Sequence, residues 1–224
     1  MTHADPSLTL HGVFRRFGYR WVVRDVSLDV AHGEAVLLVG GNGAGKTTLL
    51  RVVSGLLKAS KGRVERQGAV GMVAHHTMMY DALTARENLR FFGRLHGRSD
   101  RTRIDALLDR MGLLHVGDER IGTFSRGMLQ RLAIARALLP EPRVLLLDEP
   151  LTGLDDSASR TVVEVLAELK RGGAGMMIAS HQLVELVGSA DRVGYMVGGR
   201  MAALEPCGDA GQVVQRYREL ADRG

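Results

Sequence analysis

A glycine-rich segment carries the residues whose types and spacing best suit phosphate binding. It follows the pattern GxxxxGK[ST] and consists of Gly40, Gly41, Asn42, Gly43, Ala44, Gly45, Lys46 and Thr47, with Thr48 next. Glycines let backbone N–H groups curl around phosphate oxygens at angles that a Cβ atom would obstruct. Lys46 can place a cation on the β- and γ-phosphates of a nucleotide, and the Thr47 hydroxyl can ligate Mg²⁺. The segment predicts a nucleoside triphosphate site; the alternative is a plain strand–turn–helix corner.

Two carboxylates at the end of an apolar run supply the other half of this chemistry. Asp148 and Glu149 follow the predicted buried strand 144–147. Strand ends at the carboxyl edge of a sheet are where α/β proteins bind ligands. Asp148 can hold Mg²⁺ through water as the acidic partner of a phosphate loop, and Glu149 is then free to polarise the attacking water. An Asp-Glu pair is also common in plain loops, so the prediction depends on the phosphate segment upstream.

A serine-led segment points to a known family. The run Phe-Ser-Arg-Gly-Met-Leu-Gln-Arg at 124–131 opens a predicted helix that extends through Leu138. It resembles the signature motif of ABC ATPases, whose commonest form is Leu-Ser-Gly-Gly-Gln. The matching residues are Ser125, Gly127 and the Gln-Arg pair at 130–131, and the departures are Arg126 and Met128. From the residues alone, the alternative is a surface helix with Ser125 as its N-cap.

The resemblance implies that each nucleotide lies between two subunits. In the family, the signature motif meets the γ-phosphate bound to the other subunit. By resemblance, the residues that would do so here are Ser125, Arg126, Gly127 and Met128. The segment 152–155, which ends in Asp155, looks like the family's D-loop and follows the two carboxylates directly.

Two further nucleotide contacts follow from the resemblance. His181 comes after a predicted strand, where the family has a histidine that hydrogen-bonds the γ-phosphate and positions the water; a lone histidine there is otherwise incidental. Phe17 stands where the family has an aromatic that stacks on adenine. Tyr19 and Trp21 are nearby alternatives, and an aromatic at this spacing is as often part of the core.

One position departs from the family in a way that affects metal binding. The family has a glutamine after the strand that leads into its helical lobe; here that strand, 71–74, is followed by His75 and His76. We align His76 with the glutamine, which helps ligate Mg²⁺ and links the site to the membrane partner. Imidazole is bulkier, and protonation removes its acceptor nitrogen. We therefore expect hydrolysis to be slow or sensitive to pH.

A finer resemblance concerns the transported substrate. The stretch 74–92 and the Phe-Ser-Arg-Gly-Met signature are similar to the ATPase subunit of the bacterial haem exporter used in cytochrome c maturation. This likeness implies haem export, but the substrate is chosen by membrane subunits that lie outside this sequence.

The elements that must position these residues alternate between strands and helices. Ala35–Val39 predicts a buried strand before the phosphate segment, and 46–57 predicts a helix after it, closed by Gly55 or the segment 58–62. Helical patterns fill 77–140, with a capping box at Thr84, and strands and helices then alternate again. Alternation of this kind predicts a mostly parallel sheet with covered faces.

Composition excludes several other classes of protein. The chain of 224 residues has a single cysteine, Cys207, so no internal disulfide is possible. The start lacks the pattern of a signal peptide, and no apolar run approaches the ~18 residues that span a bilayer. We expect a cytoplasmic protein that binds peripherally to the inner face of the bacterial plasma membrane. The net charge of +5 is most simply explained by a solvated basic surface; the alternatives are attraction to nucleotide phosphates, an anionic membrane surface or nucleic acid.

These observations predict one ABC ATPase domain over 1–224: an α/β core of P-loop type, an N-terminal antiparallel β region and an inserted helical subdomain at about 77–140. The expected ligands are ATP and Mg²⁺, and the expected partners are a second ATP-binding subunit, identical or related, and transmembrane permease subunits. The stretch 78–92 is either the docking surface for the permease or part of the core. The rival functions are a regulatory switch that binds ATP with weak hydrolysis, and a soluble ABC protein acting on nucleic acid or ribosomes. No nucleic acid partner is expected, because the chain has room for neither a long coiled coil nor a second ATPase unit.

Overall fold

Two β-sheets form the centre of the molecule, whose computed structural model describes residues 6–74 and 77–222. The first sheet is antiparallel and has the order β2-β1-β4, made of β1 (Leu8–Phe17), β2 (Arg20–Val30) and β4 (Lys61–Arg66). This confirms the antiparallel region near the N-terminus. The strands β1 and β2 are joined at Gly18, whose positive φ of 55° suits a tight turn.

The second sheet is mostly parallel, as predicted. Its order is β5-β6-β7-β3-β8-β9, with β5 (Val70–Val73), β6 (Val144–Asp148), β7 (Gly175–Ala179), β3 (Ala35–Val39), β8 (Arg192–Val197) and β9 (Arg200–Pro206). Only the β8–β9 pair is antiparallel among these described strands. Every residue of β3, β6 and β7 is buried, which explains their continuous apolar runs.

The helix α1 (Lys46–Ser54) lies between the two sheets. Its apolar residues share a core with Val36 and Leu38 of β3 and with the inner residues of β1 and β2. Leu37 and Val39 belong to a second core, on the opposite face, because successive side chains of a strand point to opposite sides. The strand that precedes the phosphate segment is thus held from both faces.

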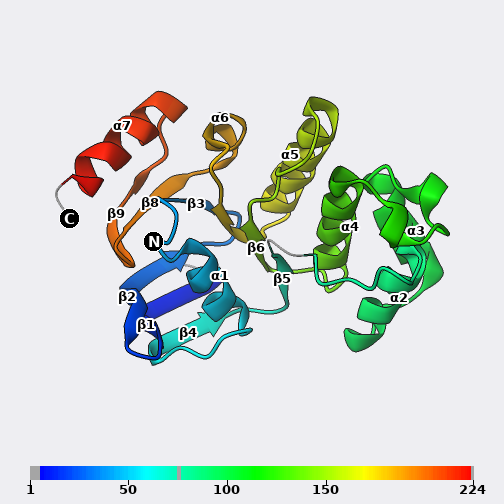
Figure 1. Cartoon of the computed structure of the whole chain (residues 1–224), viewed down its shortest axis with the longest axis horizontal. Coiled ribbons are helices and arrows are strands. Elements are labelled where there is room, and N and C mark those ends of the chain that lie inside the picture. The colour runs from blue at the N-terminus through cyan, green and yellow to red at the C-terminus, as the bar shows by residue number, and fades with distance from the viewer. Residues whose placement is uncertain (1–5, 75–76, 223–224) are drawn as a thin grey trace.

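Three helices between β5 and β6 form the predicted helical lobe: α2 (Ala85–Leu95), α3 (Arg101–Arg110) and α4 (Arg126–Leu138). Short 3₁₀ turns at Leu114–Val116 and Ile121–Thr123 connect α3 to α4. The predicted capping box is present, since the Thr84 hydroxyl accepts from the Glu87 N–H and the Glu87 carboxylate accepts from the Thr84 N–H. Asp100 caps α3. Figure 1 shows this lobe in green beside the core.

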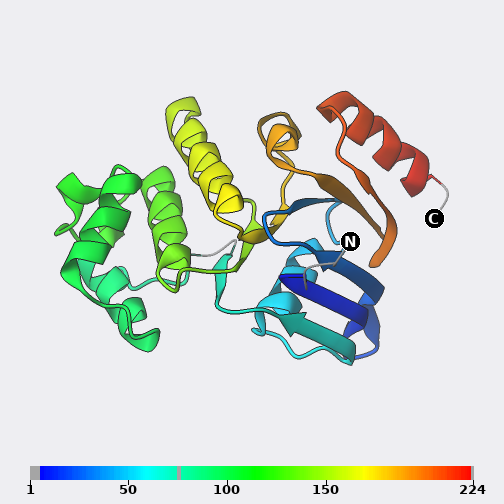
Figure 2. The same ribbon diagram turned by 180° about the vertical axis from the view of Figure 1, so that it is seen from behind.

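The last third of the chain completes the core. The helix α5 (Asp156–Arg171) stands between the lobe and the short α6 (Leu183–Leu186), which continues into a 3₁₀ turn at Val187–Ser189. The helix α7 (Ala210–Ala221) lies beside β8 and β9, as Figures 1 and 2 both show. Within the described part of the chain, no helix has the length and apolarity needed to cross a membrane.

Candidate active site

A cavity of about 570 Å³ collects most of the predicted phosphate-binding residues. It is lined by Val22, residues 41–48, Arg51, Asp148, Glu149, Thr152, His181 and Gln182. Parallel pairing of β6 with β7 and of β7 with β3 brings their carboxyl ends to one edge of the sheet. Residues that are far apart in the sequence therefore share one cavity.

The N-terminus of α1 is open toward this cavity. Among the described helices of nine or more residues, α1 alone has no side-chain cap; the other five are capped by Thr84, Asp100, Ser125, Asp155 and Asp209. The residue before α1 is Gly45, at φ 101°, and a Cβ atom there would lie 2.6 Å from the Val22 carbonyl oxygen. The first N–H groups of α1 are thus left for an anion, as a phosphate site requires.

Lys46 is held inside the loop that precedes it. Its Nζ donates to the carbonyl oxygens of Gly40 at 2.5 Å and Gly41 at 3.3 Å, and the residue is 8% exposed. Burial lowers the pKa of the Lys46 ammonium, while the carboxylates of Glu149 and Asp148 oppose that shift. The site therefore places a cation and two carboxylates around the space that a triphosphate with its metal would fill.

Thr47 and Asp148 present hard oxygen atoms side by side. The Thr47 hydroxyl donates to Asp148 Oδ1 at 3.0 Å, and Asp148 is 3% exposed. Over the described residues, no group of three or more His, Cys, Asp or Glu side chains forms a metal cluster. The paired oxygens of Thr47 and Asp148 fit Mg²⁺, which binds through one or two protein oxygens and takes its remaining ligands from phosphate and water.

Glu149 stands in a strained backbone conformation at the end of β6. Its φ is 55°, which is uncommon for a residue with a side chain, and its N–H donates to the Ala179 carbonyl at 2.8 Å. The carboxylate Oε2 accepts from the Ser180 hydroxyl and from the His181 N–H, each at 3.2 Å. The His181 Nε2 lies 3.6 Å from Oε1. The strand end β7 thus aims the Glu149 carboxylate and His181 at the same space.

Two residues have a positioning role that the sequence analysis did not predict: Gln130, which it named only as part of the signature match, and Ser180, which it did not name. The Gln130 side chain is buried and donates to the carbonyls of Glu149 at 3.2 Å and Pro150 at 2.9 Å. Gln130 lies on α4, so the signature helix is tied to the backbone of the strained Glu149. Ser180, 2% exposed, bonds both the Glu149 carboxylate and the Gln182 N–H. A glutamine one turn into a helix carries no local signal that it reaches another strand's end.

The signature segment lies outside the cavity. Ser125 and Arg126 are exposed, and the Ser125 hydroxyl accepts from the Met128 N–H at 3.2 Å as the N-cap of α4. The structure thus contains the cap that the alternative interpretation required. The aliphatic part of Arg126 lies over Gly153, because a Cβ atom on that glycine would be 3.0 Å from the Arg126 Cγ and Cδ. The segment therefore presents the capped, exposed N-terminus of α4 to solvent beside residues 152–155.

Comparison with known proteins decides the family. The family model described as ABC transporter matches residues 23–152, which is more than half of the chain. This protein belongs to the ABC transporter family. It is an ATP-binding subunit of an ABC transporter that hydrolyses ATP with Mg²⁺ and works with a second ATP-binding subunit and transmembrane permease subunits.

Curated relatives support the same family. The chain is 36% identical over 215 residues to an uncharacterized ABC transporter ATP-binding protein, YdbJ, of Bacillus subtilis, a match covering 89% of this chain and 69% of the relative. It is 40% identical over 187 residues to NatA of the same bacterium, covering 76% of each. It is 37% identical over 215 residues to the daunorubicin resistance ATP-binding protein DrrA3 of Streptomyces coeruleorubidus, covering 89% of this chain and 68% of the relative.

Solved structures share the fold of this ABC subunit. An ATP-binding subunit of an ABC transporter superposes with a TM-score of 0.84 at 27% identity, covering 96% of this chain and 98% of that one. A dimeric ATP-binding cassette in a post-hydrolysis state with ADP and Pi gives a TM-score of 0.81 at 23% identity, covering 90% of this chain and 99% of that one. The predicted ABC ATPase fold is therefore confirmed.

Three remaining predicted site residues lie outside the cavity or outside the described chain. Phe17 is 47% exposed at the end of β1, with the Arg15 guanidinium 4.6 Å from its ring centroid. Of its alternatives, Tyr19 is fully exposed and Trp21 packs edge-on against Phe14 at 5.7 Å. Asp155 caps α5 through the Ala158 N–H at 2.8 Å. His76 lies outside the described residues, so its role in this ABC subunit stays a prediction.

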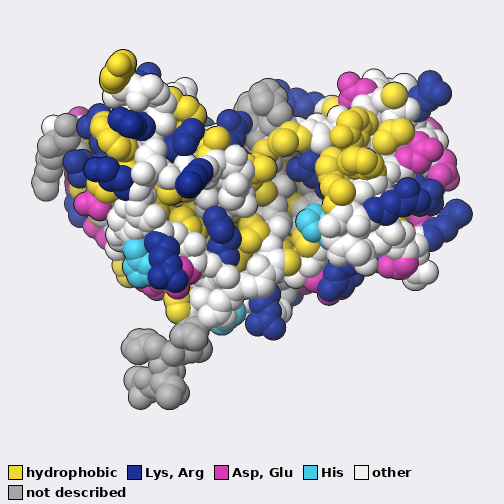
Figure 3. All heavy atoms as spheres, turned by 90° about the horizontal axis from the view of Figure 1, so that it is seen from below, with side chains coloured by type: hydrophobic (Ala, Val, Ile, Leu, Met, Phe, Trp, Pro, Cys, Tyr) yellow, Lys and Arg dark blue, Asp and Glu magenta, His cyan; other side chains and the backbone are white. Residues whose placement is uncertain are grey.

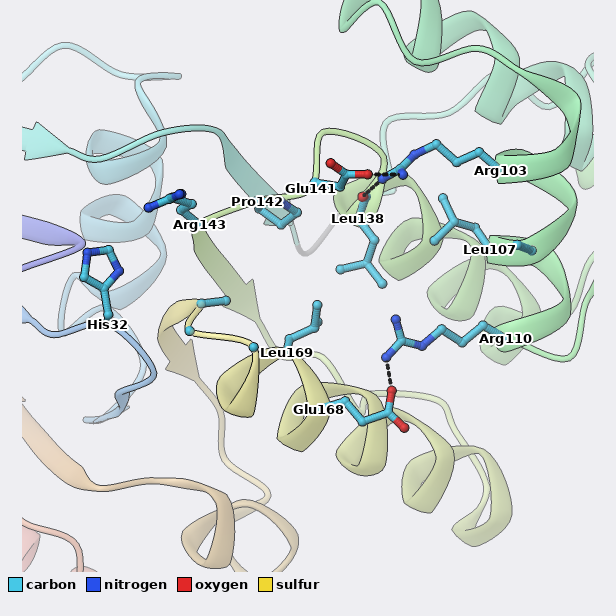
Figure 4. Close-up of a pocket in the computed structure, with 14 residues that line it drawn as sticks. His32, Arg103, Leu107, Arg110, Leu138, Glu141, Pro142, Arg143, Glu168 and Leu169 are labelled. Atoms are coloured by element: carbon cyan, nitrogen blue, oxygen red, sulfur yellow. Dashed lines mark hydrogen bonds and ion pairs between the residues drawn. The ribbon is translucent and has the colours of Figure 1, made fainter.

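A second cavity of about 880 Å³ lies between α3, α5 and the segment before β6 (Figure 4). Two arginines of α3 reach into it: Arg110 pairs with Glu168 of α5, and Arg103 pairs with Glu141. Arg103 also donates to the Leu138 and Leu139 carbonyls at 3.2 and 3.0 Å, at the end of α4. These contacts connect the helical lobe to the core of the ABC subunit, away from the phosphate loop.

Proposed function

We propose that two copies of this chain close head to tail and hydrolyse ATP at sites that both copies build. One copy supplies residues 40–48 with Asp148, Glu149, His181 and the predicted ligand His76, and the other supplies 125–128. The observation that carries this proposal is the exposed N-terminus of α4, which touches none of the cavity of its own chain. A neighbouring cassette of the same fold is dimeric with ADP and Pi.

Within each site, Glu149 is the group that we propose polarises the attacking water. Its carboxylate is fixed by Ser180 and by the His181 backbone, so one oxygen remains directed at the cavity near the His181 imidazole. Lys46 and the open end of α1 hold the phosphates, Thr47 and Asp148 hold the metal, and His181 contacts the γ-phosphate. Phe17 takes the adenine, and Asp155 belongs to the segment that borders the second copy.

We also propose that residues 1–224 form a single domain with the helical subdomain inserted at about 77–140. The support is that β5 and β6, which flank the lobe in the sequence, are adjacent parallel strands of one sheet. Ion pairs from α3 to Glu141 and Glu168 join the lobe to the core.

The permease docks, in this proposal, on an aromatic surface of the lobe that we define by Met78, Tyr80, Phe91, Phe92 and Leu95. Figure 3 shows hydrophobic side chains gathered over this part of the molecule. The Tyr80 and Phe91 rings are 5.1 Å apart and the Phe91 and Phe92 rings 5.2 Å apart, and Leu95 is 69% exposed. Exposed apolar clusters of this kind mark interaction sites. Docking would hold the protein at the cytoplasmic face of the bacterial plasma membrane.

A charge at this surface tests the docking proposal. Phe91→Glu should release the protein from membranes of its host, measured as the fraction that sediments with them, while the ATPase rate of the purified protein stays unchanged. Leu114→Glu is the matched control, because Leu114 is 40% exposed on the same lobe and Phe91 is 39% exposed. Equal sedimentation of both variants with the unaltered protein would exclude the surface.

The class of transported substrate is inferred from sequence likeness and from the names of the relatives. Haem export, which the stretch 74–92 suggests, has no counterpart in the names of the relatives reported above. Relatives named for daunorubicin, linearmycin and doxorubicin resistance favour export of a drug-like compound instead. Deleting the gene and measuring both drug sensitivity and cytochrome c content separates the two: drug sensitivity alone supports drug export, and loss of cytochrome c alone supports haem export.

A further inference from the structure

The C-terminal helix α7 contacts the phosphate loop directly. The Gly41 backbone N–H donates to the Tyr217 hydroxyl at 2.8 Å, across 176 residues of sequence. The Tyr217 ring is half-buried and packs against the larger hydrophobic core. A backbone N–H in a loop of this kind needs a partner, and here the partner is a side chain near the far end of the described chain.

The same peptide group is held from its other side. Gly40 and Gly41 share one peptide bond, whose carbonyl oxygen accepts from Lys46 Nζ at 2.5 Å and whose N–H donates to Tyr217. Hydrogen bonds on both sides of an amide polarise it and strengthen each other. The orientation of the Lys46 ammonium is therefore linked through one peptide group to the phenol of α7.

The absence of a side chain at residue 41 has a steric reason. Gly43 and Gly45 have positive φ values of 79° and 101°, but Gly41 is not among the described glycines with positive φ. A Cβ atom on Gly41 would lie 2.9 Å from the Tyr217 hydroxyl oxygen, a distance that real Cβ contacts essentially never show. Glycine at 41 thus leaves room for the phenol.

The helix that carries Tyr217 is firmly fixed to the core. Asp209 and Gln212 form a capping box at its start, and Val213 is buried. The Arg216 guanidinium binds the Glu205 carboxylate of β9 through Nε at 3.1 Å and a second nitrogen at 2.6 Å. Paired, forked contacts of this type fix orientation as well as position. Tyr217 is therefore presented to the loop by a rigid neighbour.

We propose that Tyr217 is a positioning residue for nucleotide binding, which holds the peptide group of Gly40 and Gly41 in the orientation that directs Lys46 and the loop amides toward phosphate. Without the hydroxyl, the peptide group is free to turn, and the loop must be ordered again each time that a nucleotide binds. A loop that is already ordered loses less entropy when a nucleotide binds, so the affinity of the site for nucleotide is higher.

The test measures binding of Mg-ADP by titration calorimetry, with no turnover involved. Tyr217→Phe removes only the hydroxyl and should weaken Mg-ADP binding about fivefold, the order expected for one lost hydrogen bond. Tyr195→Phe is the matched control, since Tyr195 is buried on β8 beside α7 and, among the described residues, its hydroxyl forms no hydrogen bond to the phosphate loop. That variant should bind Mg-ADP like the unaltered protein.

A double variant tests directly whether the phenol contacts residue 41 in solution. Gly41→Ala should weaken binding because its new methyl group collides with the phenol. Gly41→Ala with Tyr217→Phe should bind Mg-ADP more tightly than Gly41→Ala alone, because the colliding oxygen is gone. A tyrosine whose hydroxyl does not contact residue 41 predicts additive losses instead. Additive losses, or Tyr217→Phe binding within twofold of the unaltered protein while circular dichroism shows a folded chain, would overturn the proposal.

Discussion

The phosphate loop and the signature segment are built in opposite ways, although both are expected to contact the same nucleotide. Lys46 and Asp148 are buried, and each is hydrogen-bonded within the core. Ser125 and Arg126 are exposed, and Ser125 bonds only to its own helix among the contacts described. One region is enclosed within the chain, and the other is a capped helix end that faces solvent. The difference supports the proposal that a second chain completes each site.

Gln130 joins these two regions. It lies one turn into α4, behind the exposed end, and its amide holds the backbone of Glu149 in the strained conformation at φ 55°. A shift of the signature helix against its own core would therefore change the position of Glu149, the carboxylate that we propose polarises the attacking water. Removing single groups from each region in turn tests whether the two regions depend on each other.

The largest effect is expected at Lys46. Lys46→Ala removes the cation that faces the β- and γ-phosphates, so turnover should fall about a hundredfold or more and ATP binding should weaken. Steady-state ATPase assays with Mg-ATP measure this. Lys61→Ala, on the exposed strand β4, is the control and should behave like the unaltered protein. Near-normal hydrolysis by Lys46→Ala would mean that the phosphate loop has been wrongly assigned as the nucleotide site.

Glu149→Gln should stop hydrolysis while leaving binding intact. The amide keeps the size of the side chain but loses the charge that polarises water, a contribution of about 10²–10⁴ in rate. Because ATP then stays bound, the closed dimer should accumulate and elute earlier in gel filtration with Mg-ATP than without nucleotide. A variant that stays monomeric and hydrolyses ATP at the normal rate would remove Glu149 from the chemistry.

Gln130→Met should have an intermediate effect on the rate alone. Methionine fills the space but donates no hydrogen bond, so the Glu149 backbone relaxes and kcat should fall about fivefold with KM unchanged. Arg131→Met is the control on the same helix, because Arg131 bonds the Met111 carbonyl of the lobe at 2.7 Å and should alter stability but not kcat. If Gln130→Met has the same kcat as the unaltered protein, the signature helix does not influence Glu149 through this side chain.

The smallest effect is expected at His76, where only the sequence guides the prediction. Glutamine offers Mg²⁺ an oxygen ligand, whereas protonated imidazole repels the metal. His76→Gln should preserve or raise Mg-ATPase activity and flatten any loss of activity between about pH 7.5 and pH 6, since an ordinary histidine titrates near pH 6.5. Superimposable pH–rate profiles for both proteins would leave His76 without a role in hydrolysis.

The sequence predicts what is encoded locally. The phosphate loop, the strand before it and the capping box at Thr84 are contiguous patterns, and the structure contains the strand, the uncapped helix and the box. The bond from Tyr217 to Gly41 and the bond from Gln130 to Glu149 join segments that only the folded chain brings together. The positive φ of Glu149 likewise comes from packing between β6 and β7, because glutamate has no intrinsic preference for that conformation.

Mixing two inactive variants tests most directly whether two copies build each site. Lys46→Ala disables the phosphate loop. Arg126→Glu places a negative charge at the exposed N-terminus of α4, where an acidic residue does not destabilise the helix. A dimer of one copy of each retains one intact site, with Lys46 from one chain and Arg126 from the other. We predict that the mixture hydrolyses ATP well above the average of the two variants assayed separately. A mixture that only matches that average, or full activity of Arg126→Glu alone, would contradict the account.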